Sequence, residues 1–489
     1  MYDFPILLPV KNRCSNNSDI VQKNMSDIKI NVPEDARKII RILNDAGHEA
    51  YVVGGCVRDS VLGREPADWD ITTSASPAEV KELFRRTVDT GIKHGTVTVL
   101  MKSEGVLIGY EVTTYRIDGI YDDGRHPRNV TFTSDLSKDL ERRDFTINAM
   151  AYHPEKGLVD LFGGREDLSN RIIRCVGDAE KRFGEDALRM MRAIRFAAQL
   201  GADIEPDTYA AIKKLAPALE KVSAERIRVE AEKLLMSDNP EFFRLFYESG
   251  LTRVFLPEFD ACMVTAQENP HHAYNVGEHM LHAVSAVNLE RLAAEYSGEE
   301  YEKSKRILRL TMLLHDIGKP AKKTMDEEGI AHFKGHPELG AQMSEEILRR
   351  LRYDNDTVKM VSGLIAAHEM RYPAEKRNVR RIIGKVGEEY FPLLYYVNEA
   401  DALAQSLYMR EEKIQRLSDI RRLYKEVKND NECMSLKELA VKGADLIAAG
   451  IRPGPGMGEI LQKMLEDVIE EPSHNDREYL MSHLAEYKN

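Results

Sequence analysis

The segment that decides the fold of the first part of the chain is Tyr51-Val-Val-Gly54-Gly55-Cys-Val-Arg58-Asp59. A short apolar run typical of a strand leads into two glycines, and a helical pattern follows. Glycines at that point let a phosphate approach the backbone, and the start of the helix offers free N–H groups to an anion. Arg58 adds a charged donor one turn later. The segment predicts a phosphate-binding turn that includes Gly54 and Gly55; an ordinary tight turn is the alternative.

Two acidic residues follow in Asp68-Trp69-Asp70-Ile-Thr-Thr73. Residues two apart on a strand share a face, so both carboxylates are expected to point the same way. Carboxylate oxygens suit Mg²⁺, and paired Mg²⁺ ions can activate an attacking hydroxyl and stabilise a leaving pyrophosphate. Glu111, on another expected strand, is the candidate third carboxylate. The alternative is a solvated pair of aspartates at a strand end.

Both segments resemble the signature of the class II tRNA nucleotidyltransferase and bacterial poly(A) polymerase family. The likeness runs in order from about Val52 to Leu235 and includes three further motifs: Arg142-Arg-Asp-Phe-Thr-Ile-Asn-Ala-Met-Ala-Tyr152, Glu185-Asp186-x-x-Arg189 and Ser223-Ala-Glu-Arg-Ile227. The resemblance implies that Asp68 and Asp70 hold the metal ions. It also implies that Gly55, Arg58 and Arg143 contact a nucleoside triphosphate.

Residues 185–199 are expected to form a helix with charged residues at intervals of three: Asp186, Arg189, Arg192 and Arg195. Cytosine and adenine both present an amine donor beside a ring-nitrogen acceptor, whereas uracil and guanine present a carbonyl beside a ring N–H. A carboxylate with a guanidinium would accept the first two bases and leave unpaired groups against the others. The resemblance assigns this task to Asp186 and Arg189, and Arg192 and Arg195 are expected to face phosphates. A solvent-facing stripe of ion pairs is the alternative.

The second half of the chain contains scattered histidines and aspartates: His279, His315, Asp316, His336, His368 and Asp401. Imidazoles and carboxylates together make good sites for divalent transition metals. Their order resembles the HD phosphohydrolase superfamily, which implies a first metal on His279, His315, Asp316 and Asp401, with His336 and His368 as candidates for a second. A metal-activated water would then hydrolyse a phosphate ester, such as a 2′,3′-cyclic phosphate at an RNA end. The alternative is an HD fold kept for packing or RNA docking.

The product of the transfer reaction depends on the tail, because poly(A) polymerases share the first motifs. Relatives of the poly(A) polymerases typically end in a strongly basic extension. The tail here includes Gly443-Ala-Asp-Leu-Ile447 and Gly450-Ile-Arg-Pro-Gly-Pro-Gly456, a pattern similar to the tails of CCA-adding enzymes. CCA addition to a tRNA 3′ end from CTP and ATP is therefore expected, with CC-only or A-only addition and poly(A) synthesis as alternatives. A phosphohydrolase whose front half only docks RNA is the rival from another class.

Composition limits the class of protein. A chain of 489 residues is too long for one core, and 43% hydrophobic with 31% charged residues is ordinary for a globular protein. No apolar run is long enough for a membrane helix. Five scattered cysteines fit reduced thiols and a cytoplasmic location. The net charge of −12 does not exclude a locally basic groove for RNA. The oligomeric state is not predicted.

The pattern predicts an α+β head followed by a helical body. Strands are expected at residues 49–53, 69–73, 95–101, 109–115 and 172–176, and few thereafter. The expected parts are an N-terminal extension (1–26), a nucleotidyltransferase head (27–175), a helical neck for nucleotide selection and RNA binding (176–240), a helical linker (241–275), an HD domain (276–405) and a helical tRNA-binding tail (406–489).

Overall fold

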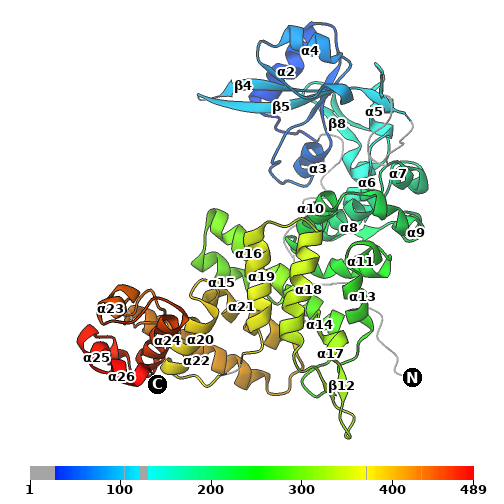
Figure 1. The fold of residues 1–489 in the computed structure, drawn as a ribbon. Coiled ribbons are helices and arrows are strands. Elements are labelled where there is room, and N and C mark those ends of the chain that lie inside the picture. The colour runs from blue at the N-terminus through cyan, green and yellow to red at the C-terminus, as the bar shows by residue number, and fades with distance from the viewer. Residues whose placement is uncertain (1–27, 104, 120–129, 371, 431, 489) are drawn as a thin grey trace. The chain divides into compact units, whose positions relative to one another are not determined.

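The computed structural model describes residues 28–103, 105–119, 130–370, 372–430 and 432–488. The predicted N-terminal extension lies outside these residues. The chain forms two compact units, Met1–Ser223 and Ala224–Asn489 (Figure 1). The boundary between them lies within residues 176–240, so the neck proposed from the sequence contributes to both units. The other domain limits stay predictions.

The first unit is built on a seven-stranded sheet with the order β3-β4-β5-β2-β1-β8-β9. Its strands are β1 (Ala50–Val53), β2 (Ile71–Thr73), β3 (Thr87–Gly91), β4 (Thr96–Ser103), β5 (Val106–Thr114), β8 (Met150–His153) and β9 (Gly157–Asp160). Neighbouring strands are antiparallel except β2 and β5, which are parallel. Shorter pairs are β6 (Arg116–Asp118) with β7 (Val130–Phe132) and β10 (Ile172–Ile173) with β11 (Asp203–Ile204). The five strands expected from the sequence are all present, with shifted ends.

Helices pack around this sheet, and the last part of the first unit is mainly helical. They are α2 (Glu34–Asp45), α3 (Gly55–Val61), α4 (Pro77–Leu83), α5 (Leu136–Glu141), α6 (Gly164–Asn170), α7 (Ala179–Glu185), α8 (Leu188–Leu200) and α9 (Pro206–Leu215), with 3₁₀ turns at Ile92–His94, Thr146–Asn148 and Ala216–Lys221. α2 buries four apolar residues at helical spacing: Ala36, Ile39, Ile40 and Leu43. A reciprocal cap between Ser76 and Glu79 starts α4.

The second unit is almost entirely helical, as predicted. Its helices are α10 (Ala224–Leu235), α11 (Arg244–Glu248), α12 (Thr252–Phe255), α13 (Pro257–Val264), α14 (Val276–Ser285), α15 (Leu289–Glu295), α16 (Gly298–Leu314), α17 (Lys319–Lys322), α18 (His336–Arg350), α19 (Asn355–Ala367), α20 (Lys376–Val386), α21 (Phe391–Ala404), α22 (Arg410–Asn429), α23 (Gly443–Ala448), α24 (Pro455–Glu470), α25 (Arg477–Ser482) and α26 (Leu484–Tyr487), with 3₁₀ turns at Pro240–Phe243 and Pro472–His474. One short hairpin joins β12 (Thr324–Met325) to β13 (Ala331–His332). Among the described residues, no helix is long and apolar enough to cross a bilayer.

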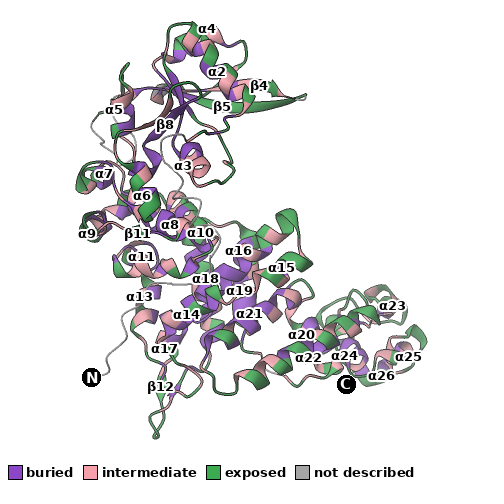
Figure 2. Cartoon of the chain, turned by 180° about the vertical axis from the view of Figure 1, so that it is seen from behind, coloured by how far each residue is buried: buried purple, intermediate pink, exposed green. Residues whose placement is uncertain are grey.

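The core of the second unit lies where α14, α16, α19 and α21 pack together (Figure 2). The last eight residues of α16, from Ile307 to Leu314, are all buried, so this helix runs through the interior. A separate apolar cluster ties α24 to the C-terminal helices through Met464, Val468 and Leu480. The histidines and aspartates described below lie on α14, α18 and α21 and just after the ends of α16 and α19.

Candidate active sites

The glycine turn between β1 and α3 has the conformation that the sequence predicted. Gly54 adopts φ 82° and ψ −127°, a region that favours glycine, and caps the N-terminus of α3. A Cβ atom on Gly54 would lie 2.9 Å from Nη1 of Arg143. Arg143 therefore lies directly over the turn, and only a residue without a side chain leaves room for it. Gly55 is more open, since its nearest neighbour would be Arg58 at 3.8 Å.

The acidic pair lies beside this turn. The N–H of Val53, the residue before Gly54, donates to the backbone oxygen of Asp70 at 3.0 Å. Strand β2 begins only at Ile71, so the expectation that Asp68 and Asp70 share a face of a strand was wrong: both precede the strand and are exposed. The strand begins late because backbone pairing with β1 and β5 begins at Ile71.

Glu111 completes the acidic cluster. In the parallel pairing of β2 and β5, Ile71 is opposite Val112, which places Glu111 beside Asp70. Loss of hydration, followed by the charges of Asp68 and Glu111, raises the pKa of Asp70 to about 6, and Arg143 opposes this shift. The three carboxylates do not each offer an oxygen within 4.8 Å of the other two. They form a loose, strongly negative edge that an oxygen-preferring cation would neutralise.

Two arginines bring positive charge to the same turn. Arg58 donates from Nε and Nη2 to Asp59, both at 2.9 Å, and from Nη1 to Asn148 at 2.7 Å. Arg143 is held more loosely, with Nη2 3.6 Å from Asp139 and a buried Nε that has no hydrogen-bond partner among the described residues. Arg143 therefore has N–H donors at this site that are available to bind an anion.

Asp186 and Arg189 lie at the junction of α7 and α8. The predicted single helix over 185–199 was wrong at its start: Asp186 is extended (φ −145°, ψ 105°), and α8 begins at Leu188. The carboxylate of Asp186 accepts from the N–H of Leu188 at 3.1 Å, and Arg189 donates to Glu185 at 2.8 Å. A helix cap is where an aspartate is most stable, which explains the break.

The expected row of four charged side chains on one helix face was also wrong. Arg192 is paired with the buried Asp144 at 2.7 Å. Burial alone would raise the pKa of Asp144, but Arg192 and the hydrogen bond from Asn148 lower it to about 2. Arg195 is only 6% exposed and lies 3.6 Å from the centroid of the Phe196 ring. Arg192 and Arg195 thus both contact side chains of the protein, and their contact with phosphates stays a prediction.

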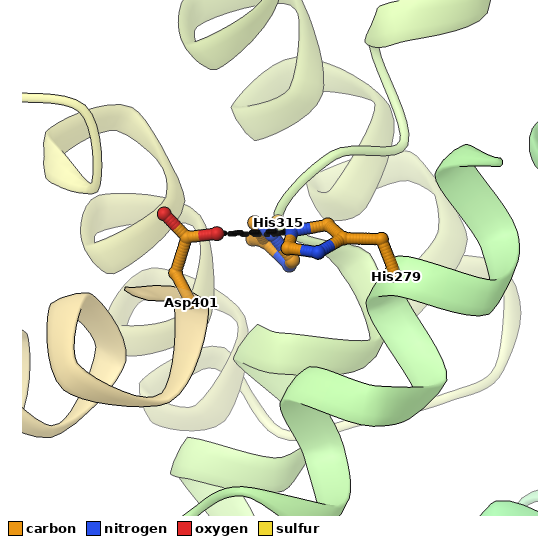
Figure 3. A group of neighbouring side chains, drawn as sticks. All are labelled: His279, His315 and Asp401. Atoms are coloured by element: carbon orange, nitrogen blue, oxygen red, sulfur yellow. Dashed lines mark hydrogen bonds and ion pairs between the residues drawn. The ribbon is translucent and has the colours of Figure 1, made fainter. Parts of the chain in front are cut away.

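In the second unit, three residues that span 122 positions of the sequence lie close together. Nε2 of His279 (α14) lies 3.2 Å from Nε2 of His315, at the end of α16, and 2.9 Å from Oδ1 of Asp401 on α21. Nε2 of His315 is 3.7 Å from the same oxygen. Figure 3 shows both imidazoles facing this carboxylate. The three groups offer ligand atoms within 4.8 Å of one another, a spacing that one metal ion could bridge.

A second group lies against the first through Asp316. Its Oδ1 is 3.2 Å from Nε2 of His336 and 3.6 Å from Nε2 of His368, while its Oδ2 is 3.3 Å from Nε2 of His315. Nε2 of His336 and Nε2 of His368 are 3.4 Å apart. One carboxylate therefore faces both groups, and the six residues predicted from the sequence are brought together.

The protonation pattern fits metal ligands. Nδ1 of His315, His336 and His368 lies 2.7–2.9 Å from a backbone carbonyl, which can only accept, so Nδ1 carries a proton and Nε2 is the atom that faces inward and can bind a metal ion when deprotonated. Burial opposes protonation of His315, but the carboxylates of Asp316 and Asp401 raise its pKa to about 10. The interior of the site attracts positive charge, and its nitrogen and oxygen atoms suit a divalent transition metal.

Several site residues were not identified from the sequence. Lys319 is buried, with Nζ 2.7 Å from Asp316 Oδ2, and donates to Gln267 at 2.9 Å. Gln405 donates to both oxygens of Asp401 at 3.0 and 3.1 Å. A cavity of about 270 Å³ is lined by Asp316, His336, His368 and Asp401, and His272, beside His279, lines it too. Lys319 and Gln405 follow a proposed ligand by three and four residues, a helical spacing that could have revealed them.

Three family models match the chain: "Poly A polymerase head domain" over residues 50–174, "Probable RNA and SrmB- binding site of polymerase A" over 201–263 and "tRNA nucleotidyltransferase domain 2 putative" over 324–484. A CCA-adding enzyme of Lactiplantibacillus plantarum is 36% identical over 447 residues, which are 91% of this chain and 94% of that protein. This chain belongs to the CCA-adding enzyme family.

Other members of the CCA-adding enzyme family agree with this assignment. The enzyme of Leuconostoc mesenteroides is 57% identical over 202 residues, which cover 41% of this chain and about half (49%) of that protein. The crystal structure of the Bacillus stearothermophilus CCA-adding enzyme in complex with CTP has a TM-score of 0.66 at 32% identity and covers 93% of this chain and 96% of that one. A Thermotoga maritima CCA-adding enzyme complexed with tRNA shares the fold, with a TM-score of 0.57 at 22% identity over 96% and 98% of the two chains.

Proposed function

We propose that this chain adds CCA to the 3′ end of tRNA with the acidic edge of its first unit as the catalytic centre. Asp68 and Asp70 would hold Mg²⁺, with Glu111 as the third carboxylate. The observation that supports these roles is the hydrogen bond from Val53 to Asp70, which fixes the acids beside the glycine turn. When bound, the metal ions supply activation of the hydroxyl and stabilisation of the leaving group.

The turn and its arginines would bind the triphosphate of CTP or ATP. The N–H groups at the start of α3 face the turn, and Arg143 lies over Gly54 with donors to spare. Arg58 is held rigidly by Asp59 and Asn148, so it is oriented before substrate arrives. In the reaction, the 3′ hydroxyl oxygen of the RNA forms a bond to the α-phosphorus, and the bond from that phosphorus to the oxygen it shares with the β-phosphate breaks. Pyrophosphate leaves, and the hydroxyl proton passes to water.

Selection of C and A is assigned to Asp186 and Arg189. Both are half-buried and lie at the same α7–α8 junction, where their geometry is fixed by the Leu188 cap and by Glu185. A carboxylate oxygen that accepts from the base amine and a guanidinium that donates to the ring nitrogen would exclude U and G. The co-crystallised CTP of the Bacillus stearothermophilus relative is consistent with this substrate class.

The product can be read directly by sequencing. Three truncated tRNAs, which lack the final CCA, CA or A, are offered all four labelled nucleoside triphosphates. Each is expected to be restored to CCA and extended no further. Each added residue requires the same Asp186–Arg189 pair, so UTP and GTP should be incorporated at a small fraction of the CTP and ATP rates. A product ending in CC, in A alone or in a run of A would contradict full CCA addition.

We infer a second activity, phosphate-ester hydrolysis, for the six histidines and aspartates of the second unit. The support is that the Nε2 atoms of four histidines lie 2.9–3.7 Å from Asp316 or Asp401. Both aspartates line a cavity whose wall also includes His336, His368 and Lys319. Hydrolysis of a 2′,3′-cyclic phosphate adds one water oxygen to phosphorus, breaks one bond to a ribose oxygen and transfers a proton to that oxygen. Divalent transition metals, when bound, lower the pKa of the attacking water.

The four described cysteines are buried and unpaired, which supports a cytoplasmic location.

Metal content tests this second site with a graded outcome. Asp316 faces both groups, so Asp316→Ala is expected to lose nearly all bound divalent metal, whereas His315→Ala should keep the group formed with His336 and His368. Metal per chain would be measured by inductively coupled plasma mass spectrometry after dialysis. His483→Ala, in the C-terminal helices, is the matched control and should retain the full content. Equal metal in Asp316→Ala and the unmodified protein would refute the site.

A further inference from the structure

A second cavity, of about 390 Å³, adjoins the metal-ligand cavity in the second unit. The two share His271, His368, Asp401 and Gln405 in their walls. The rest of the second cavity is partly apolar, with Met370, Tyr372, Met409 and Leu417, and partly charged. Its volume is within the range of ligand pockets, about 300–1,000 Å³. A molecule whose phosphate lies at the metal ligands therefore has room to extend into it.

The charged wall of this cavity is connected to the metal ligands by hydrogen bonds. Lys413 on α22 donates to the side-chain oxygen of Gln405 at 2.6 Å, and the amide nitrogen of Gln405 donates to both oxygens of Asp401. Nζ of Lys413 is also 3.2 Å from Nδ1 of His271. Lys413 is therefore occupied in orienting the site and supplies positive charge from a fixed position.

Arg416, one turn further along α22, is in a different situation. It is exposed and lines the cavity, and it makes no hydrogen bond or ion pair with any residue that the structure describes. Its charge acts on Tyr372, which lines the same cavity, and opposes the burial that raises the pKa of that phenol. Glu412 also lines the cavity and is the one acidic side chain on the α22 side of the wall. Arg416 is thus a guanidinium available for an anion.

We propose that the second cavity binds the last nucleoside of an RNA 3′ end and that Arg416 binds the phosphodiester that joins it to the preceding nucleotide. Apolar and aromatic side chains such as Tyr372 and Met370 suit a base, which RNA-binding sites stack on aromatic rings. A guanidinium suits the two free oxygens of a phosphodiester. The site then prefers the end of a polynucleotide to a free mononucleotide. This inference rests on the proposed hydrolysis at the metal ligands.

The preference can be measured as a ratio in which common effects cancel. The substrates are adenosine 2′,3′-cyclic phosphate and the dinucleotide cytidylyl-adenosine with the same cyclic end, which differ by one nucleoside and the internucleotide phosphate. The unmodified full-length chain is expected to favour the dinucleotide in kcat/KM by about tenfold, the effect of one charge-assisted hydrogen bond. Arg416→Gln should bring the ratio close to one while mononucleotide hydrolysis continues.

Arg422→Gln is the matched control, because Arg422 lies on the same helix but pairs with Glu426 and lines neither cavity. It should keep the ratio of the unmodified chain. An unchanged ratio in Arg416→Gln, or no preference in the unmodified chain, would overturn the inference.

Failure of the hydrolysis proposal is distinguishable from failure of this one. If neither cyclic phosphate is hydrolysed, the proposed activity fails, and calorimetric binding of cytidylyl-adenosine 3′-phosphate against adenosine 3′-phosphate decides the role of the cavity. A tenfold binding preference that Arg416→Gln removes supports the cavity as an RNA-end site. The inference is refuted if Arg416→Gln and the unmodified chain show the same ratio of binding constants for these two ligands.

Discussion

Replacing either Asp68 or Asp70 with asparagine is expected to reduce nucleotide incorporation by about 10³-fold or more, because each variant removes a charged oxygen ligand from the metal-binding edge. The assay is extension of a tRNA that lacks its terminal adenosine, with labelled ATP and Mg²⁺. Asparagine keeps the size of the side chain, so the fold around Ile71 and β1 should persist. Incorporation within tenfold of the unmodified chain would contradict the assignment.

Two controls make this result specific. Asp45→Asn removes an exposed carboxylate from the end of α2 in the same unit and should leave incorporation unchanged. Hydrolysis of cyclic phosphates by the second unit should continue in Asp70→Asn, since its proposed ligands all belong to the unit that begins at Ala224. A chain whose front half only docks RNA would instead show no incorporation at all, before or after the substitution.

Asp186→Ala is expected to lower kcat/KM for CTP and for ATP together by about 10²-fold, with little change for UTP and GTP. The carboxylate is proposed to accept from the amine that C and A share, so its loss removes the preference without removing triphosphate binding at Gly54 and Arg143. Single-nucleotide incorporation with each of the four triphosphates measures this directly. Unchanged selectivity would refute the role.

Asp186 also caps α8, so a loss of activity in the alanine variant needs a structural control. Asp178→Ala removes the neighbouring cap of α7, in which Asp178 accepts from the N–H of Lys181. The expected cost to stability is about 1 kcal/mol in each variant. If Asp178→Ala lowers the melting temperature as much as Asp186→Ala but keeps nucleotide selectivity, the effect of Asp186 is on the base and not on the helix.

Local patterns predicted the glycine turn of the first site, because its residues are close in sequence. Gly54 and Gly55 follow β1 directly, and Asp70 is held against Val53 by one backbone hydrogen bond. The start of β2 could not be predicted, since it depends on where β1 and β5, distant in sequence, begin to pair. Glu111 reaches the site through that same pairing.

Charge periodicity was misleading at Arg195. A charged residue at helical spacing is normally exposed, but Arg195 is buried against Phe196 and donates to Gln199. The long stem of arginine and its flat guanidinium pack well on an aromatic ring, and this partner is not visible in a periodic pattern. In the second unit, the resemblance singled out six residues that the fold brings together, but the position of Asp316 between two groups depends on the packing of α16, α18 and α19.

Three histidines of the second unit take their orientation from the main chain. The carbonyls that hold their Nδ1 atoms belong to Met312, Phe333 and Ile365, each three positions earlier than the histidine it holds. Every amino acid carries a backbone carbonyl, so a substitution at any of these three positions leaves the carbonyl that accepts the hydrogen bond in place. The orientation of these imidazoles therefore depends on the local backbone conformation and not on the side chains at those three positions.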